Sequence, residues 1–226
     1  MADTRTTDVV GSLTDVVAHS IKEVPMKRIV FVVAFAALVL PVRAQERIPA
    51  DKAEEIARLL SDHVAKLNDL QLKTQIDVTK PYGLLAGDRG VMVIPETKLS
   101  AGALKNTGKD IIPLGQLWFH KVAPAKDGKV VAEDQLRFET VNADGKDHKL
   151  VFCILGVRKS DGGDLELVVY AKGKEPILKA AITKSDARVD LPIELEAKKD
   201  TDDTATLTLN ILGSHRASIA VAKLDD

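Results

Sequence analysis

From residue 113 to its C-terminus the chain runs in short segments that alternate apolar and polar residues. The clearest is 203–212, where Ala205, Leu207, Leu209 and Ile211 alternate with Thr204, Thr206, Thr208 and Asn210. Successive side chains of a β-strand point to opposite faces, so this spacing predicts a strand with one apolar and one polar face. A helix would repeat its apolar residues every three or four positions instead. Most of the chain is therefore expected to fold as β structure.

More strands are predicted along the chain, at residues 91–94, 115–122, 135–142, 165–169, 176–183, 188–197 and 217–221. Asp-Gly pairs at 127–128 and 144–145 favour tight hairpins between strands, because both residue types tolerate a positive φ. About eight or nine short strands with such turns predict a mainly β fold, an antiparallel β-sandwich. We expect it to be immunoglobulin-like or of another Greek-key type. The Cys-Trp-Cys signature of immunoglobulin domains is absent, so this expectation rests on pattern alone.

Residues 150–155 are apolar at every position, which predicts a central strand covered on both faces. This strand holds Cys153, the only cysteine of the chain. No disulfide can form within the chain, and no zinc site can be built from several cysteines. The apolar setting disfavours the thiolate, so the thiol is expected to be buried and inert.

One amphipathic helix is expected before the strands, at residues 50–71 within an N-terminal segment 45–72. Asp51 and Glu54 have the spacing of a capping box. The apolar stripe of this helix comprises Ile56, Leu59, Leu60, His63, Val64, Leu67 and Leu70. Such a stripe must be covered, either by the following domain, which we place at 73–226, or by another copy.

Residues 26–44 have the order of a secretory signal peptide. Met26-Lys27-Arg28 is followed by apolar residues from Ile29 to Leu40 and by Ala44 at the expected cleavage point. The apolar run is too short to span a bilayer, although an uncleaved N-terminal membrane anchor is the alternative. Residues 1–25 are expected to be a non-native extension upstream of the true start Met26, or an extended n-region. The mature protein would then be periplasmic or secreted.

The overall charge does not suggest a polybasic nucleic-acid binder. The chain has 32 basic and 33 acidic residues and a formal net charge of −1. Nucleotide-binding glycine loops, the nucleophile elbow of hydrolases and the zinc-protease motif are all missing from the sequence. No cofactor is therefore expected, although a site assembled from distant residues would escape such a search.

Trp118, His120 and Tyr170 are the candidate ligand-binding residues. On one exposed sheet face they could stack against a sugar or a peptide; the favoured alternative is a packing surface covered by the N-terminal helix. No two histidines after residue 44 have the sequence spacing of metal ligands. Asp200, Asp202 and Asp203 form an acidic turn with the hard oxygen ligands of calcium, although a solvated polar turn is the simpler interpretation.

The sequence is compatible with three functions. The first is an exported, non-catalytic module that binds a protein or a cell-envelope component. The second is an extracytoplasmic hydrolase whose site combines strand-end carboxylates with a histidine, His120 or His215. The third is a carbohydrate-binding sandwich that uses Trp118. An exposed indole would favour the third, and a histidine beside paired carboxylates in a cleft would favour the second.

Overall fold

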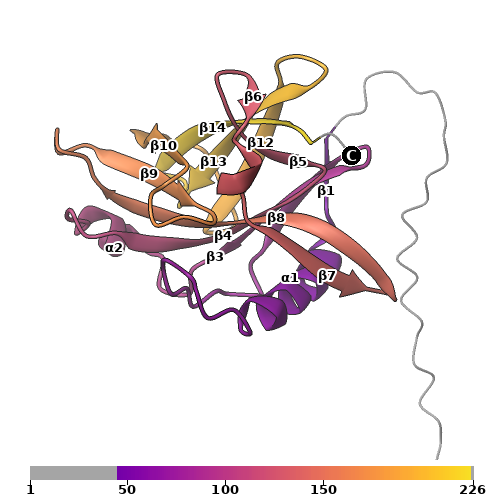
Figure 1. Cartoon of the computed structure of the whole chain (residues 1–226). Coiled ribbons are helices and arrows are strands. Elements are labelled where there is room, and N and C mark those ends of the chain that lie inside the picture. The colour runs from indigo at the N-terminus through magenta and orange to yellow at the C-terminus, as the bar shows by residue number, and fades with distance from the viewer. Residues whose placement is uncertain (1–44, 225–226) are drawn as a thin grey trace, which may run out of the picture. The chain divides into compact units, whose positions relative to one another are not determined.

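The computed structural model of the protein describes residues 45–224, so the predicted signal segment and the residues upstream of it lie outside the described part. The described fold is mainly β, with two antiparallel sheets and the helix α1 (Ala50–Val64), as Figure 1 shows. This confirms the prediction of a mainly β, antiparallel architecture preceded by one amphipathic helix. Neither α-helix of the described residues is long and apolar enough to cross a membrane.

The larger sheet has eight strands, seven of them in the order β1-β2-β3-β4-β8-β9-β10. Their bounds are β1 (Glu46–Arg47), β2 (Tyr82–Ala86), β3 (Arg89–Pro95), β4 (Ile112–His120), β8 (Lys146–Lys159), β9 (Leu165–Tyr170) and β10 (Leu178–Ala181). The eighth strand, β7 (Phe138–Ala143), pairs with the first part of β8. The prediction of a central strand at 150–155 is confirmed, because β8 lies between β4 and β9.

The second sheet has six strands, in the order β12-β13-β14-β5-β6 with β11 also paired to β14. Their bounds are β5 (Val122–Lys126), β6 (Lys129–Val130), β11 (Thr183–Lys184), β12 (Ile193–Lys199), β13 (Thr204–Ile211) and β14 (His215–Lys223). The strand predicted at 203–212 is thus confirmed as β13. The chain passes from the larger sheet to the second at Lys121, whose φ is 58°.

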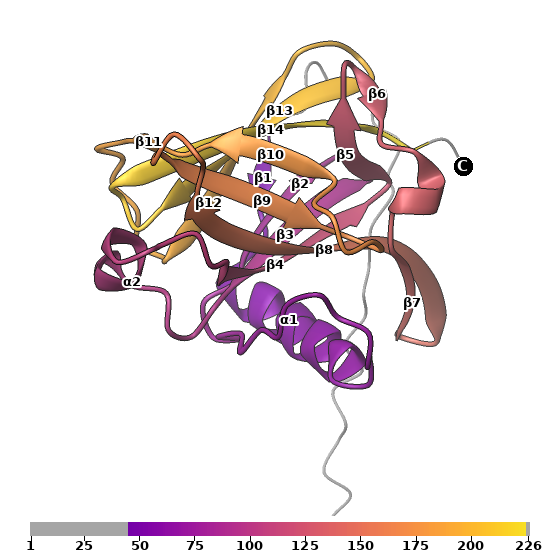
Figure 2. The same cartoon turned by 60° about the vertical axis from the view of Figure 1, so that its left-hand side comes forward.

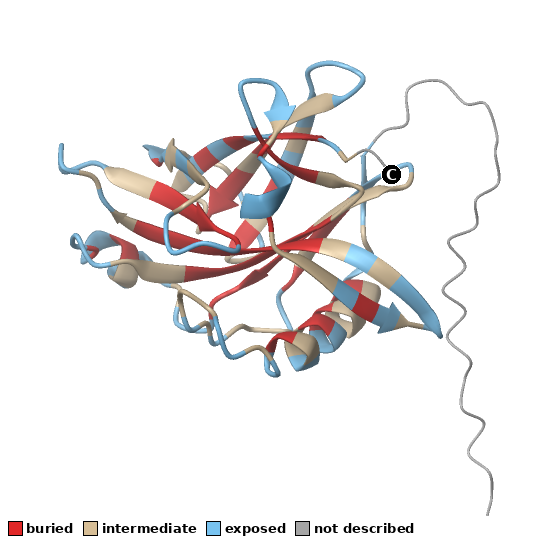
Figure 3. Ribbon diagram, in the orientation of Figure 1, coloured by how far each residue is buried: buried red, intermediate tan, exposed pale blue. Residues whose placement is uncertain are grey.

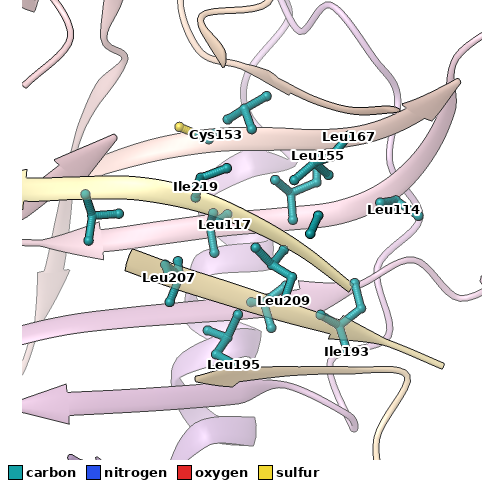
Figure 4. Packing of buried hydrophobic residues seen from close by; sticks show 14 of the residues in the cluster. Leu114, Leu117, Cys153, Leu155, Leu167, Ile193, Leu195, Leu207, Leu209 and Ile219 are labelled. Carbon is teal, nitrogen blue, oxygen red and sulfur yellow. The ribbon is translucent and has the colours of Figure 1, made fainter. Parts of the chain in front are cut away.

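The two sheets share one apolar cluster, which forms the main core. On β4 and β8 it contains Leu117, Phe119, Cys153 and Leu155, all at most 1% exposed. The second sheet contributes side chains such as Ile193, Leu195, Leu207, Leu209 and Ile219, and Figure 4 shows how the two sets interdigitate. On β8, β12, β13 and β14 every second residue faces this cluster, which is the period-two pattern that the sequence displays.

The opposite face of the larger sheet packs against α1, which lies across that sheet in Figure 2. The helix contributes Ala53, Ala57, Leu60 and Val64 to a second apolar cluster. The sheet contributes Met92, Ile94, Trp118, Phe152, Ile154, Val168 and Tyr170 to the same cluster. The larger sheet is therefore covered on both faces, and most of the apolar stripe of the helix is covered by its own chain. Leu59 of that stripe is an exception and is 36% exposed.

The helix is shorter than predicted and begins differently. It ends at Val64, and Leu67 and Leu70 reach the second cluster from the irregular segment that follows. The N-cap is Pro49 with no side-chain cap, so the predicted capping box of Asp51 and Glu54 is wrong. Proline has a fixed φ close to the helical value and fits at a helix start, so the helix begins one residue before Asp51.

Several strand bounds also differ from the expected ones. The strand predicted at 188–197 begins only at Ile193, after Pro192, although its predicted edge position is confirmed by the order of the sheet. Tyr82–Ala86 forms β2, a strand that is not among the predicted ones. Two short helices complete the structure, α2 (Ala101–Lys105) and the 3-10 helix η1 (Glu133–Gln135). Figure 3 shows burial concentrated in the strand centres and exposure at the hairpin tips.

Candidate functional site

The predicted ligand platform is a buried packing surface. Trp118 is 2% exposed, and its ring lies against that of Phe152 with 4.5 Å between centroids. Tyr170 is 4% exposed and belongs to the same cluster beneath α1, but β8 separates its strand from that of Trp118. Binding of a sugar to the indole would require α1 to leave the sheet. The geometry therefore favours the packing alternative over a stacking platform.

Polar groups are nevertheless buried at the end of this face. The indole Nε1 of Trp118 donates to Oε1 of Gln116 at 3.2 Å, and Nε2 of Gln116 donates to Oγ1 of Thr74 at 3.0 Å. Glu96 is 7% exposed and accepts the backbone N–H of Gln75 at 2.8 Å. Burial raises the pKa of the Glu96 carboxyl, opposed by its hydrogen bonds to Gln75 and Thr97. These groups hold the 74–97 region together, and they face inward.

His120 lies at the margin of the same face, and the structure places it beside another histidine. The rings of His120 and His148 have centroids 6.0 Å apart and an interplanar angle of 70°. The pKa of His120 is lowered, first by burial and then by the neighbouring His148 and Lys121. The carboxylate of Asp88 is paired with Lys121 at 3.0 Å. His120 therefore has a histidine neighbour rather than the paired carboxylates that the hydrolase hypothesis requires.

His63 takes part in a chain of charged groups that the sequence did not reveal. Its Nε2 lies 2.8 Å from Oε2 of Glu139, which joins the end of α1 to β7. Arg137 donates to the same carboxylate at 2.7 Å and to Asp69 at 2.8 Å. Residues on the helix, on β7 and in the connecting segment are linked in this way. The contacts fasten the helix to the sheet, so His63, which the sequence pattern places on the apolar stripe, also forms a polar contact.

The remaining predicted candidates lie in turns of the second sheet. Asp200, Asp202 and Asp203 are exposed in the β12–β13 turn, where Lys199 pairs with Asp202 and Thr206 donates to Asp200. Among residues 45–224 no group of three potential metal ligands occurs, so calcium binding by this turn stays a prediction. Oγ of Ser214 lies 2.9 Å from Nδ1 of its neighbour His215. Within the described residues no carboxylate hydrogen-bonds to that histidine.

An open cleft of about 820 Å³ lies between β5–β6, η1 and the β9–β10 loop. Its charged lining is mixed and comprises Lys126, Asp127, Asp134, Lys172, Lys174 and Glu175. Three basic and three acidic side chains line it, so it has no strong preference for an anion or a cation.

The clearest candidate for recognition is the two-stranded arm, which we define as residues 138–150 of β7 and β8. β8 pairs with β4 only from Val151 onward, because β4 ends at His120. The first part of β8 therefore has β7 on one side and no strand on the other within the described residues. The outer edge of β7 is likewise unpaired there. Figures 1 and 2 show the arm projecting beyond the rest of the sheet.

The register fixes which backbone groups point outward on the arm. Phe152 N–H donates to the carbonyl of Arg137, so even-numbered residues of β8 direct their backbone groups toward β7. The backbone groups of Asp147 and Lys149 consequently point to the side where β4 has ended. By the same alternation Thr140 and Asn142 on β7 point their backbone groups to its open edge. The arm thus presents unpaired donors and acceptors on both edges.

Sequence reasoning placed a strand and a turn here but did not recognise the arm as a surface. The signal in the sequence is the polar run at 146–149, which directly precedes the apolar run of 150–155. A comparison of the chain with models of protein families, with curated proteins and with solved structures found no match in any of the three.

Proposed function

We propose that the chain is an exported, non-catalytic module that binds a protein or a component of the cell envelope through the two-stranded arm. The observation that carries this proposal is the pair of unpaired strand edges on β7 and β8. An extended peptide can join such an edge, since main-chain hydrogen bonds supply affinity and alternate side chains supply specificity. Trp118 and Tyr170 are buried, so their rings are not accessible to a partner. This favours the arm over the outer sheet face as the binding surface.

The arm is suited to this role because it is anchored at its base and open at its tip. Val141 is 4% exposed and packs in the cluster under α1, while Glu139 is held by Arg137 and His63. Between and beyond these anchors, Thr140 and Asn142 are exposed, and the turn at Asp144-Gly145 takes positive φ values of 52° and 74°. A strand held rigidly at one end needs little ordering when a partner adds to it.

The finer description of the fold belongs to the same proposal. We propose a sandwich with Greek-key connections, in which the helix covers one outer face. Support comes from β5, which leaves the larger sheet at Lys121 and pairs with β14, the last strand of the chain. The shared apolar cluster between the two sheets also supports a sandwich.

Site-specific cross-linking in the native host tests the binding role. A photoreactive residue at Thr140 should trap a defined partner, whereas one at Ser218, an exposed position inside the paired strand β14, should not. Thr140→Pro removes an outward N–H from an edge strand, where proline is tolerated, and should weaken binding of the trapped partner at least tenfold. Thr140→Val is the matched control and should bind normally. Equal cross-linking at Thr140 and Ser218, or unchanged binding by the proline variant, would overturn the proposal.

Export is tested separately by sequencing the N-terminus of the native protein. A mature chain that begins near Gln45 supports cleavage of the predicted signal peptide. An intact N-terminus at Ala2 would contradict export through this segment.

A further inference from the structure

The pairing of β4 with β8 brings together two histidines that lie far apart in the sequence. The register places Phe119 opposite Val151, so the next residue His120 and the diagonal residue His148 share the outer face of the sheet. Their ring centroids are 6.0 Å apart, with the planes inclined at 70°. Both side chains are half-buried, so one side of the pair is open to solvent.

This separation suits two imidazoles that share one metal ion. A zinc–nitrogen bond of about 2 Å and a tetrahedral angle place two ring centroids roughly 5 Å apart. Coordination of one ion therefore requires the two rings to lie slightly closer than they do in the structure. Imidazole is a preferred ligand of zinc, copper and nickel among the divalent ions.

The His120 ring also lies near Asp88 and Lys121. The nearby carboxylate of Asp88 pairs with Lys121 and partly balances its charge.

We propose that His120 and His148 bind a divalent transition-metal ion of the zinc class. Among residues 45–224 no third potential ligand completes a group of three, so water fills the remaining coordination positions. A site with two protein ligands and open positions binds weakly on its own and can accept a further ligand from outside the chain. The proposal does not depend on partner binding by the arm.

Titration calorimetry of the full chain with zinc chloride tests the site. The protein is purified without a polyhistidine tag, in a buffer without chelators. One ion should bind per chain, and His120→Ala and His148→Ala should each weaken binding at least tenfold. His215→Ala and His63→Ala are matched histidine controls and should leave the affinity unchanged. Absence of binding, or equal binding by the His148 variant, would overturn the proposal.

Two further measurements distinguish loss of the metal site from loss of the fold. His148→Asn retains a polar side chain at a half-buried position, and its melting temperature without metal should match that of the unaltered chain. Zinc should then raise the melting temperature of the unaltered chain alone, since only a protein that binds the ion in its folded state is stabilised. The copper-loaded protein should show two nitrogen ligands by electron paramagnetic resonance. One nitrogen, or a zinc-induced rise retained by His148→Asn, would contradict a shared site.

Discussion

The two faces of the larger sheet are built on different principles, although the same strands supply both. Toward the second sheet, the buried side chains of β4 and β8 are all apolar, such as Leu117, Phe119 and Leu155. Toward α1, the buried surface mixes apolar rings with Gln116 and Glu96, and it ends in the charged contact of His63 with Glu139. Adjacent residues of one strand therefore have very different environments.

The inner face contributes mainly to the stability of the fold, and the outer face mainly to the placement of the helix. Apolar contacts between the sheets are non-directional and account for most of the favourable free energy of folding. Hydrogen bonds beneath and beside α1 are directional, and a buried polar group left without its partner is destabilising. We therefore infer that the inner face holds the fold together, while the outer face fixes where the helix and its following segment lie.

The largest effect is expected on the inner face. Leu117→Ala leaves a cavity at a position that is 0% exposed between the sheets. It should lower the free energy of unfolding by about 3 kcal/mol, as large-to-small substitutions in well-packed cores do. Urea denaturation followed by circular dichroism measures the loss. A decrease below about 1 kcal/mol would show that the two sheets do not form one tight core.

A moderate effect is expected one residue along, on the other face. Trp118→Phe removes the indole N–H that Gln116 accepts and leaves that oxygen buried without a donor. The free energy of unfolding should fall by about 2 kcal/mol. Adding Gln116→Met should recover part of the loss, because the unsatisfied oxygen is then gone. If the double variant loses more free energy of unfolding than the two single variants together, the unsatisfied hydrogen bond does not explain the effect of Trp118→Phe.

A smaller coupling is expected between α1 and β7. A double-mutant cycle with His63→Ala and Glu139→Gln should give a coupling free energy of about 1 kcal/mol, since the pair is only partly exposed. Thermal unfolding of the four proteins at equal ionic strength measures it. Additive effects would mean that the apolar cluster alone positions the helix.

The smallest effect concerns pH and comes from Glu96. Burial raises the pKa of this carboxyl above its ordinary value of 4.5, so the folded state binds the proton more tightly than the unfolded state. The contribution of Glu96 to stability is therefore greatest below pH 4.5 and is lost as pH rises through the raised pKa. Glu96→Gln keeps an acceptor for Gln75 and should flatten this part of the stability profile. An unchanged profile would show that Glu96 titrates normally.

The periodicity of apolar and polar residues was sufficient to predict part of the fold. β13 and the central part of β8 could be predicted because their periodicity reports burial directly. The helix end could not, because Leu67 and Leu70 continue the helical spacing while packing from an irregular segment. Tyr82–Ala86 forms a strand despite its turn-like residues, since pairing with β3 outweighs local propensity.

The candidate sites depended on pairing that the sequence does not display. His120 and His148 come together through the register of β4 and β8, and His63 meets Glu139 through the docking of α1 on the sheet. Each contact joins residues that no local motif connects. Trp118 is buried, which agrees with the packing alternative rather than with a ligand platform, because a large ring in an apolar run has area to bury.

The lone cysteine can report how often the core between the two sheets opens. Cys153 is 0% exposed in the core between the sheets, and burial raises the pKa of its thiol strongly. A thiol reagent in solution can modify it only after β8 has separated from the second sheet. The rate of labelling under native conditions therefore measures how often the two sheets part, with no engineered probe needed.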